Sequence, residues 1–232
     1  MWFFRDLRPG AGWGLLDSAG RPKAAWWHLR RAWARQALLL TDEGLEGLHV
    51  HLFNETDVAL EGRLEVDLFQ GGRIPVGHAE QAVSVPAHGA RSLSADALLG
   101  GFSDLTYAYR FGPPRHDVVI TRLVAGDGGT VLAEDVRFPL GWNLPFQDSG
   151  GITAAAEQGP EGTFILVLQS PVFLQSVVLT SRSHGPGDNH FHLAPGRPKR
   201  IRFTPRGDPS APFRAELAAL NLREALPLRG DP

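Results

Sequence analysis

The feature that most constrains the fold is a change of hydrophobic period near residue 37. Before it, residues 21–36 carry apolar side chains at helical spacing, because Trp26, Leu29 and Trp33 fall at i, i+3 and i+7. Pro22 suits the first turn of such a helix. After residue 37, apolar and polar residues alternate, which is typical of half-buried strands. One helix near the start and a β-rich remainder are therefore expected.

Alternation predicts strands that short turns separate. The 27 glycines and 18 prolines also favour many short strands over long helices, and Gly, Pro, Asn and Asp cluster between the apolar runs. Strands spaced so closely indicate an antiparallel sandwich. The predicted strands cover residues 48–53, 64–68, 106–110, 163–169, 174–180, 200–204 and 215–221.

The expected fold class is mainly β, with two antiparallel β-sandwiches after a short strand-loop-helix segment. We expect that segment in residues 1–37, the first sandwich with a linker in residues 38–148 and the second in residues 149–232. A Pro- and Gly-rich stretch without a sustained period, residues 138–151, is the predicted linker. Net charges of +5, −9 and +2 in these three parts favour packing of the basic leader, residues 1–37, against the acidic first sandwich.

Composition excludes several classes of function. The chain has no cysteine, so thiolate metal sites and cysteine nucleophiles are ruled out. A net charge of −2 gives no support to nucleic-acid binding. Residues 1–20 lack the apolar core of a signal peptide and no apolar run reaches about 18 residues, so we expect a soluble chain with no membrane partner. No cofactor motif is present.

Two local patterns have a functional and a structural interpretation. His49 with His51, and His190 with His192, share a face at strand spacing, but zinc needs a third ligand and no such frame is evident, so no metal site is expected. Asn54-Glu55-Thr56 matches a glycosylation acceptor and contains an Asn-Glu pair, yet an ordinary turn is the preferred interpretation. The basic run at residues 197–202 alternates like a strand with a solvated face.

The aromatic leader and a second stretch, residues 188–196, carry spaced motifs. The leader motif consists of Trp2, Asp6, Pro9, Trp13, Asp17, Gly20, Arg21, Lys23 and Ala24. At this spacing the leader resembles the last barrel strand, loop and final helix of family 2 glycoside hydrolases of the β-mannosidase type. Residues 188–196 resemble the Asp-Asn-x-Phe-x-Leu-x-Pro-Gly stretch in the C-terminal immunoglobulin-like domain of those enzymes.

The resemblance implies two immunoglobulin-like domains that follow a catalytic TIM barrel. In that family both catalytic glutamates precede the matched segment, so it implies that this chain holds no catalytic residue and is inactive alone. It also implies that Trp2 is an apolar platform under the sugar in the complete enzyme, which retains configuration at β-linked sugars. The barrel is then the expected partner and a carbohydrate the expected substrate.

Two alternatives remain open. A free-standing β-sandwich that binds carbohydrate would use exposed aromatic side chains, with Trp142, Phe146 and Tyr109 as candidates. A protein-interaction module would instead expose an apolar patch.

Overall fold

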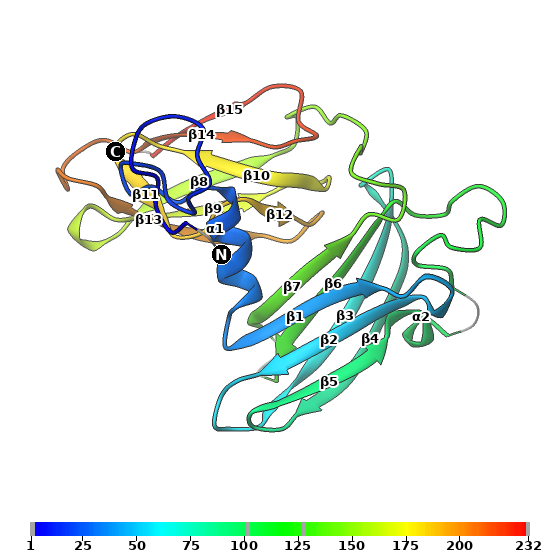
Figure 1. Cartoon of the computed structure of the whole chain (residues 1–232). Helices are drawn as coiled ribbons and strands as arrows, with labels where there is room; N and C mark the ends of the chain where they lie inside the picture. The colour runs from blue at the N-terminus through cyan, green and yellow to red at the C-terminus, as the bar shows by residue number, and fades with distance from the viewer. Residues whose placement is uncertain (1–2, 101–102, 127–128, 231–232) are drawn as a thin grey trace. The chain divides into compact units, whose positions relative to one another are not determined.

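The structure is a computed structural model, and it describes residues 3–100, 103–126 and 129–230. The chain divides into two compact units (Figure 1). One unit joins Met1–Arg30 to Pro145–Pro232, and the other is Arg31–Leu144. Each unit contains one β-sandwich of two antiparallel four- or three-stranded sheets, so the predicted mainly β fold class is confirmed.

The first sandwich lies in Arg31–Leu144. A 3-10 turn, η1 (Gly44–Glu46), and a short helix, α2 (Ala95–Leu98), connect its strands. One sheet has the order β1-β2-β5, namely Gln36–Asp42, Leu48–Asn54 and Gly89–Ser94. The other has the order β4-β3-β6-β7, namely Ile74–Val85, Leu60–Gln70, Val118–Ala125 and Val131–Arg137.

Period-2 alternation places the first core. On β2, Leu48, Val50 and Leu52 are fully buried, whereas the histidines between them are partly exposed. These side chains pack against Leu64 and Leu123 of the facing sheet. Burial of one such side chain contributes about 1.5–3 kcal/mol, so the alternation itself fixes which face of each strand points inward.

The second sandwich lies in Pro145–Pro232. One sheet has the order β12-β10-β14-β15, namely Phe191–Leu193, Leu174–Thr180, Arg214–Ala218 and Leu226–Arg229. The other has the order β11-β13-β9-β8, namely His184–Pro186, Lys199–Pro205, Phe164–Gln169 and Thr153–Gln158, with a 3-10 turn, η2, at Pro160–Gly162. A core of aromatic and aliphatic residues that includes Phe203 and Leu217 separates the sheets.

The register of β10 against β12 shifts between Leu174 and Val177. Two buried side-chain amides form hydrogen bonds with backbone groups in and next to this irregular strand. Asn189 accepts a hydrogen bond from the Leu179 N–H and donates one to the Leu179 carbonyl. Asn221 accepts from Gln175 N–H and donates to the carbonyl of Phe173. Each amide thus satisfies backbone groups as a neighbouring strand would.

The leader belongs to the same unit as the second sandwich. Helix α1 (Ala24–Ala32) follows it, and Arg30 donates a hydrogen bond of 2.8 Å to the carbonyl oxygen of Gly187. The packing of the leader against the first sandwich that its charge favours stays a prediction.

Three details of the sequence prediction are wrong. The helix is shorter than residues 21–36 and buries Trp27, whereas Trp33 is 67% exposed. Residues 106–110 form a loop instead of a strand, because Tyr107 and Arg110 adopt positive φ angles of 56° and 54°. Weakly alternating strands such as β4 and β7 were also missed. No helix among the described residues is long and apolar enough to cross a membrane.

Candidate functional site

The leader is held in one shape by two carboxylates. Asp6 accepts a hydrogen bond of 2.7 Å from the backbone N–H of Gly14 and pairs with the ammonium group of Lys23. The Lys23 hydrogen bond and then the Gly14 N–H lower the pKa of Asp6. A β-carbon on Gly12 would lie 2.3 Å from Asp6 Oδ1, so any other residue there would displace this carboxylate.

Asp17 closes the next turn of the leader. Its carboxylate accepts hydrogen bonds from the backbone N–H groups of Arg21 and Ala19 and pairs with the Arg21 guanidinium at 2.6 Å. The Arg21 N–H contributes most to the lowered pKa of Asp17. The segment between Asp6 and Lys23 is therefore an ordered loop that its own side chains close.

Bulky apolar side chains project from this ordered loop into solvent. Leu7 is 98% exposed and Trp13 82% exposed, and more than half of Phe3 and Phe4 is exposed. The Phe4 ring meets Trp26 of α1 edge to face, with 6.3 Å between the ring centroids. Exposed apolar clusters on a rigid support are typical of interaction surfaces.

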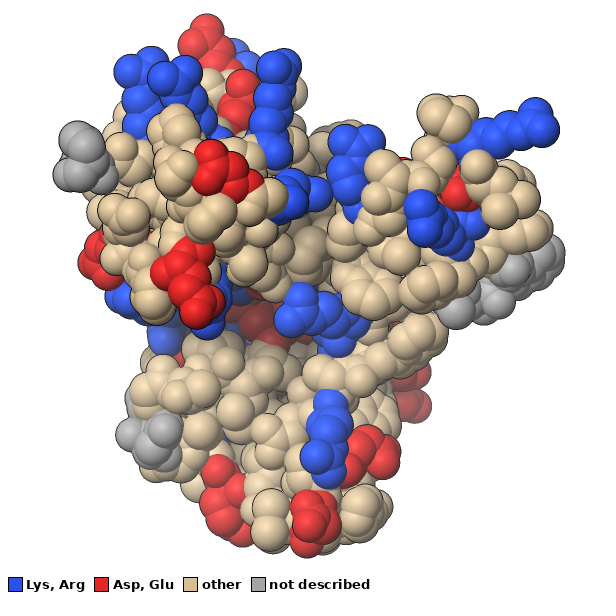
Figure 2. Space-filling view, turned by 90° about the vertical axis from the view of Figure 1, so that its left-hand side faces the viewer, with Lys and Arg blue, Asp and Glu red and all other residues tan. Residues whose placement is uncertain are grey.

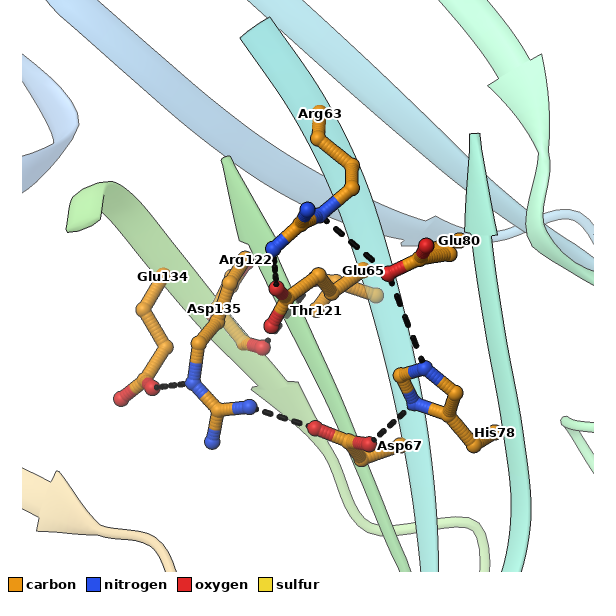
Figure 3. Close-up of polar contacts among 9 residues, drawn as sticks. All are labelled: Arg63, Glu65, Asp67, His78, Glu80, Thr121, Arg122, Glu134 and Asp135. Carbon is orange, nitrogen blue, oxygen red and sulfur yellow. Dashed lines mark hydrogen bonds and ion pairs between the residues drawn. The ribbon is translucent and has the colours of Figure 1, made fainter. Parts of the chain in front are cut away.

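The outer face of the sheet β4-β3-β6-β7 carries a network of charges (Figure 3). Glu80, Glu65, Arg122 and Glu134 lie opposite one another across the four strands. Arg122 is only 2% exposed, and it donates to Glu134 at 2.7 Å through Nε and to Asp67 at 2.5 Å through Nη1. A buried guanidinium needs such partners to compensate for its lost hydration.

The rest of the same network lies on β3 and β4. The buried Glu65 faces the exposed Glu80 there, and Arg63 lies 2.8 Å from Glu65 and 3.3 Å from Glu80. These contacts raise the pKa of Arg63, and the hydrogen bond to Glu65 has the largest effect. His78 Nδ1 lies 2.7 Å from Asp67. Each of the four carboxylates in the network therefore has a cationic neighbour.

Behind this face, Asp135 ties the two sheets of the first sandwich together. Its Oδ2 accepts a hydrogen bond of 2.9 Å from the Leu40 N–H on β1, and its Oδ1 accepts one from Val136 N–H. Thr121 donates to the Asp135 carbonyl (Figure 3). Burial raises the pKa of Asp135, and it outweighs the two N–H groups, which lower this pKa.

The aromatic site residues that the sequence suggested are exposed where the structure describes them. Trp2 lies outside the described residues. Trp142 is 61% exposed and packs on Phe138, with 5.0 Å between the ring centroids. Phe146 is also exposed, beneath the guanidinium of Arg223. Tyr109 lies in the loop of residues 103–116 and stacks on another aromatic ring of that loop.

The Asn54-Glu55-Thr56 turn is structural, as the preferred interpretation held. The Asn54 side chain is fully buried, and its amide donates to the carbonyls of Val58, Val85 and Pro86. Its oxygen accepts from Thr56 N–H and Oγ1–H. This amide is therefore inaccessible to a modifying enzyme in the folded chain.

His51 and His192, one from each histidine pair, form hydrogen bonds with other residues. His51 lies 2.7 Å from Thr41 Oγ1 and 3.1 Å from Ser92 Oγ, and its ring centroid is 6.4 Å from that of His49. His192 accepts a hydrogen bond from Ser176 N–H. Among the described residues, no group of three or more His, Asp or Glu is placed to hold a metal ion.

At least two of the four cations in the basic run, residues 197–202, have carboxylate partners. Lys199 pairs with Asp188 at 3.1 Å and Arg200 with Glu157 at 3.6 Å. On the face shown in Figure 2, cationic and anionic side chains are interspersed with neutral ones. The run is thus the solvated side of β13, as expected.

Sequence reasoning missed the charge network. Its members alternate with core residues on β3 and β6, so the signal was present in the Glu-x-Asp pattern at Glu65 and Asp67. The opposing Arg122 follows an unbroken apolar run, Val118–Ile120, and only strand pairing shows that it faces these carboxylates.

Comparison with known proteins supports the fold alone. No protein-family model and no curated protein matches the chain. Among solved structures, β-D-mannosidase from Dictyoglomus thermophilum is similar with a TM-score of 0.76 at 18% identity, over 97% of this chain and 26% of that one. Exo-chitosanase from Amycolatopsis orientalis is similar with a TM-score of 0.68 at 14% identity, over 98% of this chain and 30% of that one. The chain thus spans about a quarter to a third of these proteins.

Proposed function

We propose that this chain is a non-catalytic accessory region of a β-mannosidase-like retaining glycoside hydrolase, in which it braces a catalytic barrel. The observation that carries the proposal is the ordered leader, whose exposed Leu7 and Trp13 would pack against the rest of the barrel. The match of Asp6 and Lys23 to the family pattern supports it, because the structure gives this pair a definite role in shaping that loop.

The charge network supports a bracing role over a catalytic one. Retaining hydrolysis needs two carboxyl groups about 5–5.5 Å apart across a sugar pocket, one of them protonated. The carboxylates on the described face instead neighbour Arg63, Arg122 or His78. In the complete enzyme, Trp2 would supply the apolar platform under the sugar ring.

The first test of the proposal is hydrolysis of aryl glycosides by the purified chain. With 4-nitrophenyl β-D-mannoside and 4-nitrophenyl β-D-glucosaminide, we expect no release of nitrophenol above the buffer rate. If the chain hydrolyses either substrate, and a substitution of Glu65 or Glu80 abolishes that turnover, the non-catalytic assignment is overturned.

The coding sequence upstream of Met1 is the second test. In-frame βα repeats over the length of a barrel, about 250 residues, would support the proposal. A stop codon immediately upstream, with no glycosidase barrel encoded nearby, would count against it.

A further inference from the structure

We propose that the first sandwich carries a carbohydrate-binding pocket beside α2, for an uncharged or amino-bearing pyranose. The pocket is a shallow hollow of ≈ 190 Å³ that is widely open to solvent. Its lining includes Leu45, Glu46, Gly47, Asp96, Asp104 and Tyr109. The proposal concerns this chain alone and does not depend on the bracing of a barrel.

The pocket is preformed because Asp96 fixes its floor. Asp96 Oδ2 accepts a hydrogen bond of 2.6 Å from Leu48 N–H, and Oδ1 accepts one of 2.9 Å from Leu105 N–H. Gly47 has a φ of 85°, and a β-carbon there would lie 2.4 Å from Asp96 Oδ2. A site held in this way loses little conformational entropy when a ligand binds.

The aromatic wall of the pocket is Tyr109, and its ring is fixed from three directions. Asp104 accepts hydrogen bonds of 2.9 Å from the backbone N–H groups of Ala108 and Tyr109. The Tyr109 hydroxyl donates to the Leu45 carbonyl at 3.0 Å. Phe111 stacks on the ring with an interplanar angle of 21°. A rigid, 40% exposed ring at the edge of a hollow suits the C–H face of a sugar.

The polar side of the pocket selects the charge of the ligand. The carboxylates of Asp96 and Asp104 accept hydrogen bonds from backbone N–H groups. The Glu46 carboxylate, by contrast, is exposed and has no side-chain partner among the described residues. Glu46 can accept hydrogen bonds from sugar hydroxyl or ammonium groups, as polar groups in such pockets do. The three carboxylates disfavour phosphates and uronic acids by like-charge repulsion.

Calorimetric titration of the full chain tests the pocket. The probes are β-1,4-mannopentaose and the β-1,4-glucosamine pentamer, with a galacturonate pentamer as the anionic comparison. We expect the first two to bind and the galacturonate pentamer not to bind. Absence of binding by both mannose and glucosamine pentamers would overturn the proposal.

Three variants locate the binding. Tyr109→Leu should weaken binding at least about fivefold, and Tyr109→Phe, which keeps the aromatic face, should restore most of it. Glu46→Gln should weaken the glucosamine pentamer more than the mannose pentamer. Trp33→Leu is the matched control, because Trp33 is an exposed aromatic residue in another segment of the same unit. Trp142→Leu tests the other exposed aromatic candidate in this unit.

The outcomes separate binding from folding. Circular dichroism of Tyr109→Phe and Glu46→Gln should match that of the original chain, so their affinities report the pocket itself. Binding that survives both Tyr109→Leu and Glu46→Gln would overturn the proposal. So would binding that Trp142→Leu abolishes while Tyr109→Leu leaves it unchanged.

Discussion

At the scale of single residues, several side chains of this protein form hydrogen bonds with backbone groups that no neighbouring strand pairs. Asn54, Asn189 and Asn221 each satisfy peptide groups that no neighbouring strand reaches. Asp6 and Asp104 do the same in loops, where they collect backbone N–H groups. Buried or ordered backbone without such partners would lose about 1–3 kcal/mol for each unsatisfied group.

Asn54→Ala should lower the free energy of unfolding by about 2–3 kcal/mol, because the Val85 and Pro86 carbonyls and the Thr56 N–H each lose a hydrogen bond. Urea unfolding followed by fluorescence measures the change. Glu55→Ala, in the same turn but exposed, should stay within about 0.5 kcal/mol of the original chain. Equal effects of the two substitutions would contradict the assigned role of Asn54.

His116 should make stability depend on pH. Burial lowers its pKa, and its Nε2 lies 3.5 Å from the Leu105 carbonyl oxygen at the base of the Tyr109 loop, residues 103–116. Because the unfolded chain takes up this proton first, the free energy of unfolding should fall as the pH drops below about 6.5, the unperturbed value, towards the folded pKa. His116→Gln should flatten that part of the pH profile. A profile that this substitution leaves unchanged would contradict the assignment.

At the scale of elements, strand pairing decides which charges meet. Register places Arg122 of β6 between β3 and β7, and its near-complete burial makes Asp67 and Glu134 necessary (Figure 3). Asp135 joins β7 to β1 in the same sandwich. The sheet face is thus held by polar contacts as well as by the core on its other side.

Arg122→Met should lower the free energy of unfolding by about 2–3 kcal/mol, since it removes the buried guanidinium that contacts both Asp67 and Glu134. This loss is smaller than the loss expected when a fully buried ion pair is broken, because both carboxylates are partly exposed. Arg63→Met, which removes a half-exposed guanidinium from the same network, should cost under about 1 kcal/mol. Thermal unfolding of both variants measures the difference, and a larger loss for Arg63→Met would refute this account.

Elements with strong periodicity were predictable from sequence, and elements fixed by tertiary contacts were not. Alternation identified β2 and β10 because one face of each strand is buried. The same alternation at residues 106–110 was misleading, because hydrogen bonds to Asp104 hold those residues in a loop. The pocket and the buried Arg122 join residues distant in sequence, so no local pattern indicates them.

At the scale of the whole molecule, two sandwiches with separate cores accompany a leader that exposes its apolar side chains. We base on that combination our proposal that the chain braces a glycoside hydrolase barrel. The fold shared with a β-D-mannosidase and an exo-chitosanase over most of this chain is in accord with the claim.

The most direct measurement is complementation in trans. A β-mannosidase barrel from the same genome, expressed without its C-terminal region, should gain thermal stability and activity on 4-nitrophenyl β-D-mannoside when this chain is added. Leu7→Asp and Trp13→Asp should abolish the gain, whereas Leu220→Asp, at an exposed leucine of the second sandwich, should preserve it. If the unmodified chain leaves the barrel's stability and activity unchanged, or if the Leu7 and Trp13 variants complement as well as it does, the account is contradicted.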